Sequence, residues 1–185
     1  MPIETEIKIW IDKPAAVRKK LRDLGYEVHA PRVFESNTVL DTVEKQLRSN
    51  GELLRLRRSG RAGLVTYKGI AKDGGPHKSR EEIETSVSDP DAAQEIFSRL
   101  GLEPAFRYEK YRTEYKCRGS SGIVTIDETP IGNFLELEGP ASWIDKTAQK
   151  LGYAPSDYIT KSYGALYFEY CHDQGIEPSN MVFDK

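Results

Sequence analysis

The chain contains little cysteine and little histidine. Its 185 residues include two cysteines, Cys117 and Cys171, which are too few for a disulfide framework or a zinc-binding thiolate pattern. The three histidines, His29, His77 and His172, show no ligand spacing. A histidine-based metal site and a Ser-His-Asp arrangement therefore have little support. No phosphate-binding loop of the Walker type is present either.

Long apolar runs and an excess of one charge are also missing. No segment approaches the ~20 apolar residues of a membrane helix, and the N-terminus has no basic-then-apolar export signal. Lys and Arg total 27 against 29 Asp and Glu, which gives a formal net charge of −2. General nucleic-acid binding normally requires a marked basic excess. We therefore expect a cytoplasmic protein that binds neither membranes nor nucleic acid in general.

What the sequence does contain is an alternation of polar and apolar residues with period two, which is typical of β-strands. Eight strands are predicted, at about 2–11, 33–42, 52–59, 62–69, 78–87, 106–117, 122–128 and 133–139. Helices are predicted from near Asp12 to Gly25, from Ser88 to Gly101 and over 141–151, from their caps, early prolines and terminal glycines. A further helix is predicted over 156–174, where Tyr163, Leu166, Tyr167 and Tyr170 share one face. The length suits one domain, expected over 1–175, with an irregular tail over 176–185.

Charged side chains collect on one face of the predicted strands. Residues two apart share a face, so Arg55 and Arg57 point one way while Leu54 and Leu56 point the other. One interpretation is an antiparallel sheet whose wet face carries a lattice of salt bridges. The other is an α+β fold in which the eight strands close into an antiparallel barrel, with the charges inside and helices covering the outside. Both signs of charge occur on the same strands, which favours the tunnel. Charges confined in this way must pair with one another or with a charged ligand.

Such a tunnel is suited to phosphate and metal chemistry. The cations whose guanidinium or ammonium groups can bind phosphate oxygens are Arg55, Arg57, Lys68, Arg80, Lys110 and Arg112. The carboxylates that supply hard oxygen ligands for Mg²⁺ or Mn²⁺ are Glu4, Glu6, Glu82, Glu84, Asp127, Glu136 and Glu138. Together these are the parts of metal-assisted phosphoryl or nucleotidyl transfer. Lys8 either forms an ion pair with a glutamate or, if it is desolvated among the arginines, has a lowered pKa and activates a water.

The segment Glu4-Thr5-Glu6-Ile7-Lys8 resembles the Glu-x-Glu-x-Lys signature of the CYTH superfamily of triphosphate tunnel metalloenzymes. This superfamily includes class IV adenylyl cyclases, thiamine triphosphatases and inorganic triphosphatases. The resemblance extends over about residues 3 to 170. It continues through Leu54-Arg55-Leu56-Arg57, Tyr67-Lys68-Gly69, Arg80-Glu81-Glu82-Ile83-Glu84, Lys110-Tyr111-Arg112, Asp127, Gly132-Asn133-Phe134-Leu135-Glu136-Leu137-Glu138 and Lys161-Ser162-Tyr163.

The resemblance implies a closed tunnel that binds a triphosphate end-on with a divalent metal, and it gives the cations and carboxylates named above those two roles. Lys8 is similar to the family lysine that activates the attacking water, and Lys161 to a basic residue at the start of a C-terminal lid helix. Asn37 and Val39 stand where many relatives carry an acid and an aromatic, so no nucleoside pocket can be identified. We expect hydrolysis of inorganic or small organic triphosphates. Adenylyl cyclase activity and non-catalytic polyphosphate or nucleotide binding are the alternatives, and a homodimer is left open.

Overall fold

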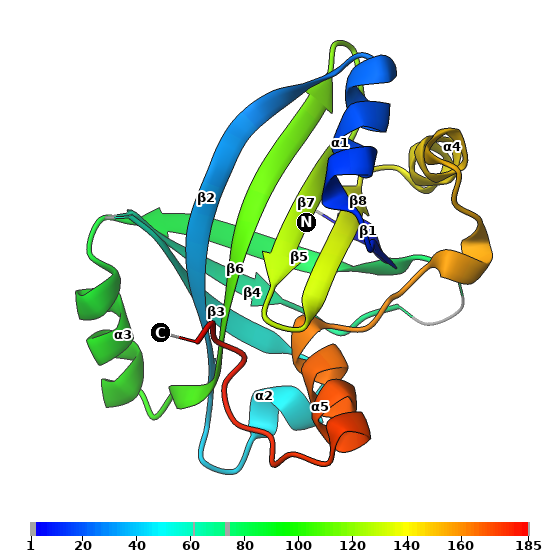
Figure 1. The fold of residues 1–185 in the computed structure, drawn as a ribbon. Helices are drawn as coiled ribbons and strands as arrows, with labels where there is room; N and C mark the ends of the chain where they lie inside the picture. Colours follow the sequence, from blue (N-terminus) through cyan, green and yellow to red (C-terminus); the bar gives the residue numbers. More distant parts are fainter. Residues whose placement is uncertain (1–2, 61, 73–74, 185) are drawn as a thin grey trace.

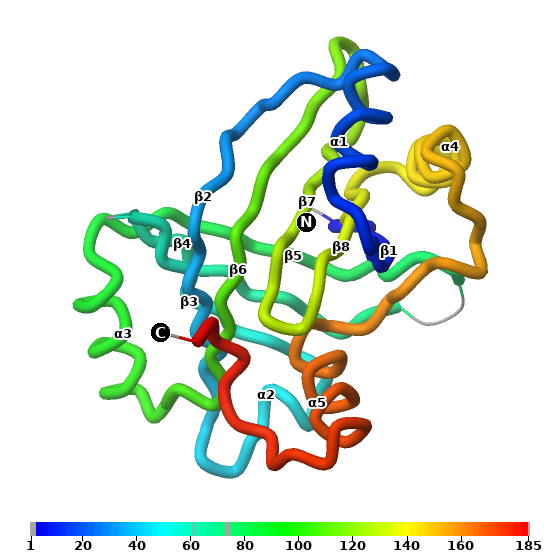
Figure 2. Tube along the Cα trace, in the orientation of Figure 1, coloured from blue at the N-terminus to red at the C-terminus, as the bar shows by residue number. Residues whose placement is uncertain are grey.

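The computed structural model describes residues 3–60, 62–72 and 75–184, in which eight strands form one closed antiparallel barrel. The strands are β1 (Ile3–Trp10), β2 (Tyr26–Asp41), β3 (Leu53–Ser59), β4 (Ala62–Lys68), β5 (Lys78–Val87), β6 (Glu103–Cys117), β7 (Ile123–Thr129) and β8 (Gly132–Glu138). Their order around the barrel is β1-β5-β4-β3-β2-β6-β7-β8. The barrel is closed by β1, which pairs Glu4 with Arg80 of β5 and Lys8 with Glu136 of β8. The predicted closed barrel is therefore confirmed (Figures 1 and 2).

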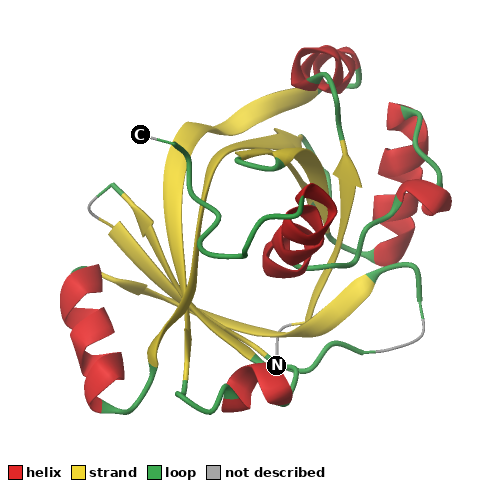
Figure 3. Cartoon of the chain, turned by 60° about the horizontal axis from the view of Figure 1, so that its bottom comes forward, coloured by secondary structure: helices red, strands yellow, loops and turns green. Residues whose placement is uncertain are grey.

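Helices lie outside this barrel, as predicted, and each belongs to a different part of its wall. They are α1 (Pro14–Asp23), α2 (Gln46–Ser49), α3 (Pro90–Arg99), α4 (Ala141–Leu151) and α5 (Tyr163–Gln174), with a 3₁₀ turn η1 (Pro155–Asp157). The fourth helix lies beside β1 and β8, α1 packs beside β2 and α4, and α3 covers β3 and β4 (Figure 1). One open end of the barrel lies beneath α5, as Figure 3 shows. Across the described residues, each helix is either too short or too polar to span a bilayer.

The apolar core lies between the barrel wall and its helices. Ile7, Ile9 and Leu135 are at most 1% exposed on the outer face and pack with Leu21 of α1 and Ile144 of α4. Complete burial of such a side chain contributes about 1.5–3 kcal/mol. Because the outer face carries this packing, the alternate residues of the same strands must point inward. This places the charged side chains in the lumen.

The main differences from the prediction are the starts of two elements and one added helix. β2 begins at Tyr26 because a long, bulged ribbon pairs it with β6 before the closed part of the barrel begins. The short helix α2 was not predicted; the buried carboxylate of Asp41 holds it by accepting from the backbone N–H groups of Leu47 and Arg48. The helix predicted from residue 156 begins only at Tyr163, since the preceding chain instead pairs with β1.

The chain after α5 packs on the barrel without forming a helix or a named strand. Residues 180–181 run beside β6 at a stretch where β7 is no longer paired with it. Met181 accepts from the Glu109 N–H at 2.9 Å and donates to the Arg107 carbonyl at 3.0 Å, and its side chain is fully buried. Asn180 accepts from the Arg107 N–H. The tail therefore closes part of the barrel end beside α5.

Candidate active site

The barrel encloses a cavity of about 660 Å³ that reaches from the lumen to the end covered by α5. It brings together almost all of the residues predicted for the site. Those that line it are Glu4, Glu6, Lys8, Arg55, Arg57, Lys68, Arg80, Glu82, Glu84, Lys110, Arg112, Glu136 and Glu138. Side chains from six of the eight strands thus converge on one space.

Strand alternation places the arginines of β3 inside. Arg55 and Arg57 point into the lumen while Leu54 and Leu56 pack outward. Arg55 donates to the Thr66 hydroxyl at 3.1 Å and to the Tyr108 hydroxyl at 3.3 Å. Arg55 also lies 3.6 Å from a Glu84 oxygen and 4.0 Å from a Glu82 oxygen. Neutral hydroxyls and carboxylates therefore both hold its guanidinium group.

Ion pairs connect the lumen cations to the lumen carboxylates. Lys68 lies 2.6 Å from a Glu4 oxygen and 3.2 Å from a Glu82 oxygen. Arg112 bonds directly to Glu136. Cations and carboxylates line the cavity in nearly equal number. An incoming phosphate chain must therefore displace carboxylates from these cations, which leaves acidic groups that need another positive charge.

Lys8 lies between two carboxylates rather than among arginines. Its ammonium group is 3.2 Å from Glu6 and 3.4 Å from Glu136, and the residue is 3% exposed. Burial alone would lower the pKa of Lys8, but Glu6 and Glu136 outweigh it and raise the pKa above its ordinary value. The lowered pKa considered from the sequence is therefore wrong for this environment. The ion-pair interpretation describes the structure, and Lys8 acts here as a fixed positive charge.

Two glutamates show that the carboxylate side of the lumen is short of positive charge. Burial raises the pKa of Glu82 to about 8, with neighbouring Glu4 and Glu84 adding to the effect against the opposing influence of Lys68. Desolvation within the tunnel, together with Glu4 and Glu136, raises the pKa of Glu138 to about 7. A cation bound among these oxygens would favour their ionised forms. The donor set therefore fits a divalent metal chemically.

The geometry of the carboxylates limits what kind of metal site this is. Among the described residues, no three His, Cys, Asp or Glu side chains are grouped closely enough to enclose an ion. Mg²⁺ usually keeps several waters and binds through one or two carboxylates plus substrate phosphates. Glu4, Glu6, Glu136 and Glu138 fit this open mode of binding. They do not form a closed protein cage in the part of the chain that the structure describes.

Several buried donors in the lumen wall have no hydrogen-bond partner among the described residues. These donors are Nε of Arg55, Nε of Arg80 and Nδ2 of Asn37. One buried acceptor, Oε2 of Glu35, likewise has no hydrogen-bond partner there. Buried polar groups are normally satisfied, so such atoms indicate positions where a ligand or water completes the bonding. Phosphate oxygens would satisfy the two arginine donors.

Two predicted site residues lie outside the cavity wall. Asp127 is fully buried behind it and binds Lys110 and Arg112. Lys161 is exposed, and its ammonium group pairs with Glu169 at 2.6 Å. Its neighbours Ser162 and Tyr163 do line the cavity, because α5 begins there.

Two residues that line the cavity were not predicted as site residues, although alternation along their strands places their side chains on the inward face. Lys78 precedes Arg80 by two residues on β5 and lines the same cavity, 3.9 Å from Glu6. Burial, together with Arg80, lowers the pKa of Lys78 to about 8. Tyr108 precedes Lys110 on β6 in the same way. The period-two rule could have found both.

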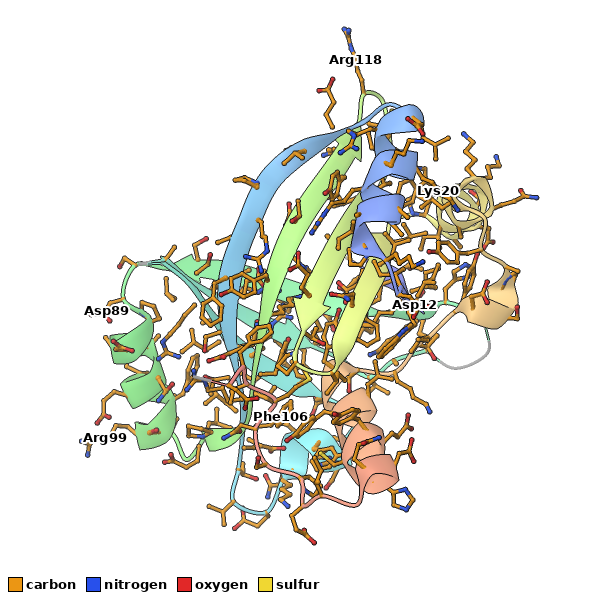
Figure 4. The ribbon with its side chains drawn as sticks, viewed as in Figure 1. Asp12, Lys20, Asp89, Arg99, Phe106 and Arg118 are labelled. Carbon is orange, nitrogen blue, oxygen red and sulfur yellow. The ribbon has the colours of Figure 1, made fainter. Side chains whose placement is uncertain are left out.

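One end of the cavity carries a group of apolar side chains, although the charged Arg48 also lies there, 5.2 Å from the centre of the Phe168 ring. Val39, Leu47, Leu53, Phe106 and Phe168 line it where β2, β3 and β6 meet α2 and α5. Phe106, labelled in Figure 4, lies at this end of the barrel. These side chains offer no bonds to phosphate. They provide a surface for an apolar or aromatic group.

A closed antiparallel barrel with a lumen of mixed charge defines a class of tunnel proteins, and comparison with known proteins places the chain within it. The family model described as CYTH domain matches residues 2–163. The chain belongs to the CYTH domain family.

Individual relatives agree with this assignment. The chain is 33% identical over 144 residues to a Methanocaldococcus jannaschii protein named as a candidate adenylate cyclase, covering 78% of this chain and 81% of that protein. A Vibrio parahaemolyticus structure, also described as a candidate adenylate cyclase, matches with a TM-score of 0.78 and 20% identity, over 89% of this chain and 97% of that one. A Hippeastrum protein described as a candidate adenylyl cyclase with a dominant triphosphatase activity matches with a TM-score of 0.64 and 17% identity, over 95% and 97% of the two chains. The two structures show a shared fold.

Proposed function

We propose that the protein is a Mg²⁺- or Mn²⁺-dependent triphosphatase that hydrolyses inorganic or small organic triphosphates. The observation that carries this proposal is the enclosed lumen, in which arginines and lysines face carboxylates across one space. The Hippeastrum relative supports it, since that protein is described as having a dominant triphosphatase activity. The shared family supports enzymatic use of the lumen.

The lumen cations would hold the phosphate chain. Arg55 and Arg57 on β3 and Arg80 on β5 present guanidinium forks, which bind phosphate oxygens bidentately. Lys68 and Lys110 add point charges from β4 and β6. Held from several sides, the phosphate chain has little freedom, which favours in-line attack. Catalysis by positioning and charge neutralisation follows from this arrangement.

The carboxylates would hold the metal and order the attacking water. Glu4, Glu6, Glu136 and Glu138 are the residues that would hold Mg²⁺ or Mn²⁺. When bound, the metal neutralises charge on the phosphate oxygens. Lys8 lies against Glu6 and Glu136, where its fixed positive charge can orient a water or stabilise the negative charge that develops on the phosphate.

Adenylyl cyclase activity is the second candidate. The apolar side chains at the cavity end favour a nucleoside triphosphate as substrate over inorganic triphosphate. Leu47, Leu53, Phe106 and Phe168 could accommodate the organic part of a nucleoside triphosphate. The ribose 3′-hydroxyl would then attack in place of water. The Methanocaldococcus and Vibrio relatives support this alternative, since both are described as candidate adenylate cyclases. A non-catalytic phosphate-binding module would use the same residues without turnover.

Product analysis separates these functions. The purified protein is mixed with tripolyphosphate, thiamine triphosphate or ATP, each with Mg²⁺, Mn²⁺ or EDTA, and both phosphate release and cyclic AMP are measured. We expect metal-dependent phosphate release. Cyclic AMP without phosphate release would assign the cyclase reaction, and tight binding without any product would assign the binding module.

Adjacent arginines provide a matched pair of variants for this experiment. Arg57 faces the lumen, whereas Arg58 points outward and bonds to Asp91 and Gln94. We expect Arg57→Gln to lower kcat/KM by roughly 10- to 100-fold, since a charge-assisted phosphate contact contributes about 1.5–3 kcal/mol. Arg58→Gln should leave kcat/KM unchanged. Equal effects of the two substitutions would refute a lumenal active site.

A further inference from the structure

Tyr163, the first residue of α5, joins the helix over the barrel end to the ion pairs of the lumen wall. Its hydroxyl donates to Oδ2 of Asp127 at 2.7 Å, and the residue is 5% exposed. The Ser162 side chain caps the helix by accepting from the Ala165 N–H at 3.2 Å. The cap fixes where α5 begins. It thereby also fixes where the tyrosine hydroxyl lies.

Asp127 is held by donors from three residues of the lumen wall and α5. Its Oδ1 accepts from Nε of Arg112 at 2.7 Å. Its Oδ2 accepts from Nη2 of Arg112 at 2.6 Å, from Nζ of Lys110 at 2.8 Å and from the hydroxyl of Tyr163. The carboxylate therefore accepts four hydrogen bonds, one on Oδ1 and three on Oδ2, and three of the four come from the cations Arg112 and Lys110. The residue is fully buried behind the cavity wall, so it anchors its partners instead of facing a ligand.

We propose that Tyr163 is a positioning residue which, through Asp127, holds Lys110 and Arg112 in place for binding a phosphate chain. In this arrangement Asp127 is an anchor for the two cations and not a metal ligand. The inference rests on the proposed function of the lumen as a triphosphate site. It extends that function by assigning to α5 a direct part in ordering the phosphate-binding wall.

The ring of Tyr163 adds a second contact to the same cations. Nζ of Lys110 lies 5.2 Å from the ring centroid and Nζ of Lys8 lies 5.4 Å from it. Both distances are within the range of cation–π attraction. The substitution Tyr163→Phe keeps these ring contacts and removes only the hydroxyl. It therefore isolates the bond to Asp127.

A purely structural role must be distinguished from positioning, because the Tyr163 ring also packs in an aromatic cluster. Tyr167, one turn further along α5, belongs to that cluster and is 8% exposed. Its hydroxyl lies 3.5 Å from the Ser179 hydroxyl, away from the lumen. Tyr167→Phe is therefore the matched control. If a buried hydroxyl matters only for packing, the two substitutions will have equal effects.

The test measures binding of inorganic tripolyphosphate by calorimetry in EDTA, with melting temperature as the check on folding. A hydrogen bond to a charged group is strong enough that we expect Tyr163→Phe to weaken tripolyphosphate binding about tenfold. Tyr167→Phe should bind it as the wild type does. In phosphate-release assays, Tyr163→Phe should raise KM while the Mg²⁺ concentration for half-maximal activity stays unchanged.

Three results would overturn the inference: unchanged tripolyphosphate binding by Tyr163→Phe, an equal loss in Tyr167→Phe, or a raised Mg²⁺ requirement in Tyr163→Phe. The last would instead indicate that the tyrosine supports a metal site at Asp127. Failure of the proposed function is a separate outcome. It would appear as wild-type protein that binds tripolyphosphate but releases no product, and the binding comparison would still decide the role of Tyr163.

Discussion

Lys8 illustrates how a single residue can be recognised from sequence while its chemistry cannot. Alternation along β1 predicted that it shares a face with Glu4 and Glu6, and it does. Burial, Glu6 on the same strand and Glu136 opposite it across the β1–β8 pair together set the pKa of Lys8. That register joins residues 128 positions apart in the chain, and it depends on closure of the barrel. The direction of the pKa shift therefore required the structure.

Replacing Lys8 should make folding depend more strongly on divalent metal. In Lys8→Met, Glu6 and Glu136 lose a buried cation, and we expect about 3 kcal/mol of destabilisation. Added Mg²⁺ should raise the melting temperature of Lys8→Met more than that of the wild type, because it replaces the lost charge. Thermal melts with and without Mg²⁺ measure both effects. Lys116→Met, at an exposed position on β6, serves as the control.

Unequal destabilisation is the decisive feature of that experiment. If Lys8→Met and Lys116→Met melt alike in EDTA, Lys8 does not neutralise the lumen carboxylates. An identical Mg²⁺ response in Lys8→Met and wild type would separate Lys8 from the metal-binding oxygens.

Glu128 provides a pH-dependent ion pair on the outside of the barrel, away from the lumen. Its carboxylate accepts from Arg18 of α1 at 2.6 Å and from Arg32 of β2 at 3.0 Å. Burial would raise the pKa of Glu128, but its bonds to Arg32 and Arg18 outweigh this and lower it. The stabilisation is therefore complete above the unfolded-state pKa of about 4.3 and is lost as pH falls through the lower folded-state value.

Glu128→Gln tests this dependence. Because the group is partly exposed to solvent, we expect a loss of about 1 kcal/mol at pH 7. The difference between variant and wild type should shrink towards zero as the pH falls below about 4. Chemical denaturation at pH 7, 5 and 3 measures it. A difference that stays constant over this range would show that the carboxylate charge is not what stabilises the contact.

At the scale of elements, local signals predicted α3 well and α5 poorly. Asp89 and Pro90 begin α3 as expected, with the Asp89 carboxylate accepting from two backbone N–H groups of the first turn (labelled in Figure 4). The start of α5 depends instead on Ile159, whose backbone pairs with Lys8 of β1. A capping residue is visible in sequence, but pairing with a distant strand is not. This contact delays the helix to Tyr163.

The C-terminal segment is a second element whose importance the sequence did not reveal. Met181 is fully buried against Tyr108, Tyr163 and Cys171. Met181→Ala should destabilise the protein by about 2–3 kcal/mol through lost packing. Met181→Leu conserves volume and should cost less than about 1.5 kcal/mol. Urea denaturation compares the three proteins, and an alanine variant as stable as the wild type would show that this segment does not seal the barrel end.

For the molecule as a whole, closure of the barrel decides both fold and site. Alternation predicted which residues share a face, but an open sheet with a wet face was compatible with the same pattern. Closure follows from the pairing of β1 with both β5 and β8. It converts a charged face into a lumen where Arg57, Lys110 and Glu138 border one cavity. Residue types and spacing therefore predicted which charged residues line the cavity, while their ion pairs came from the closed geometry.

The balance of charge in the lumen predicts that metal and triphosphate bind cooperatively. A triphosphate that takes Lys68 from Glu4 leaves the Glu4 oxygens without their nearest cation. A divalent ion would compensate for them, so each ligand should strengthen binding of the other by the same factor, typically 5- to 150-fold. Calorimetric titration of tripolyphosphate into the protein with EDTA or with Mg²⁺, corrected for the metal–tripolyphosphate complex in solution, measures this factor. Equal affinities under the two conditions would mean that the lumen carboxylates remain paired with protein cations when the phosphate chain is bound.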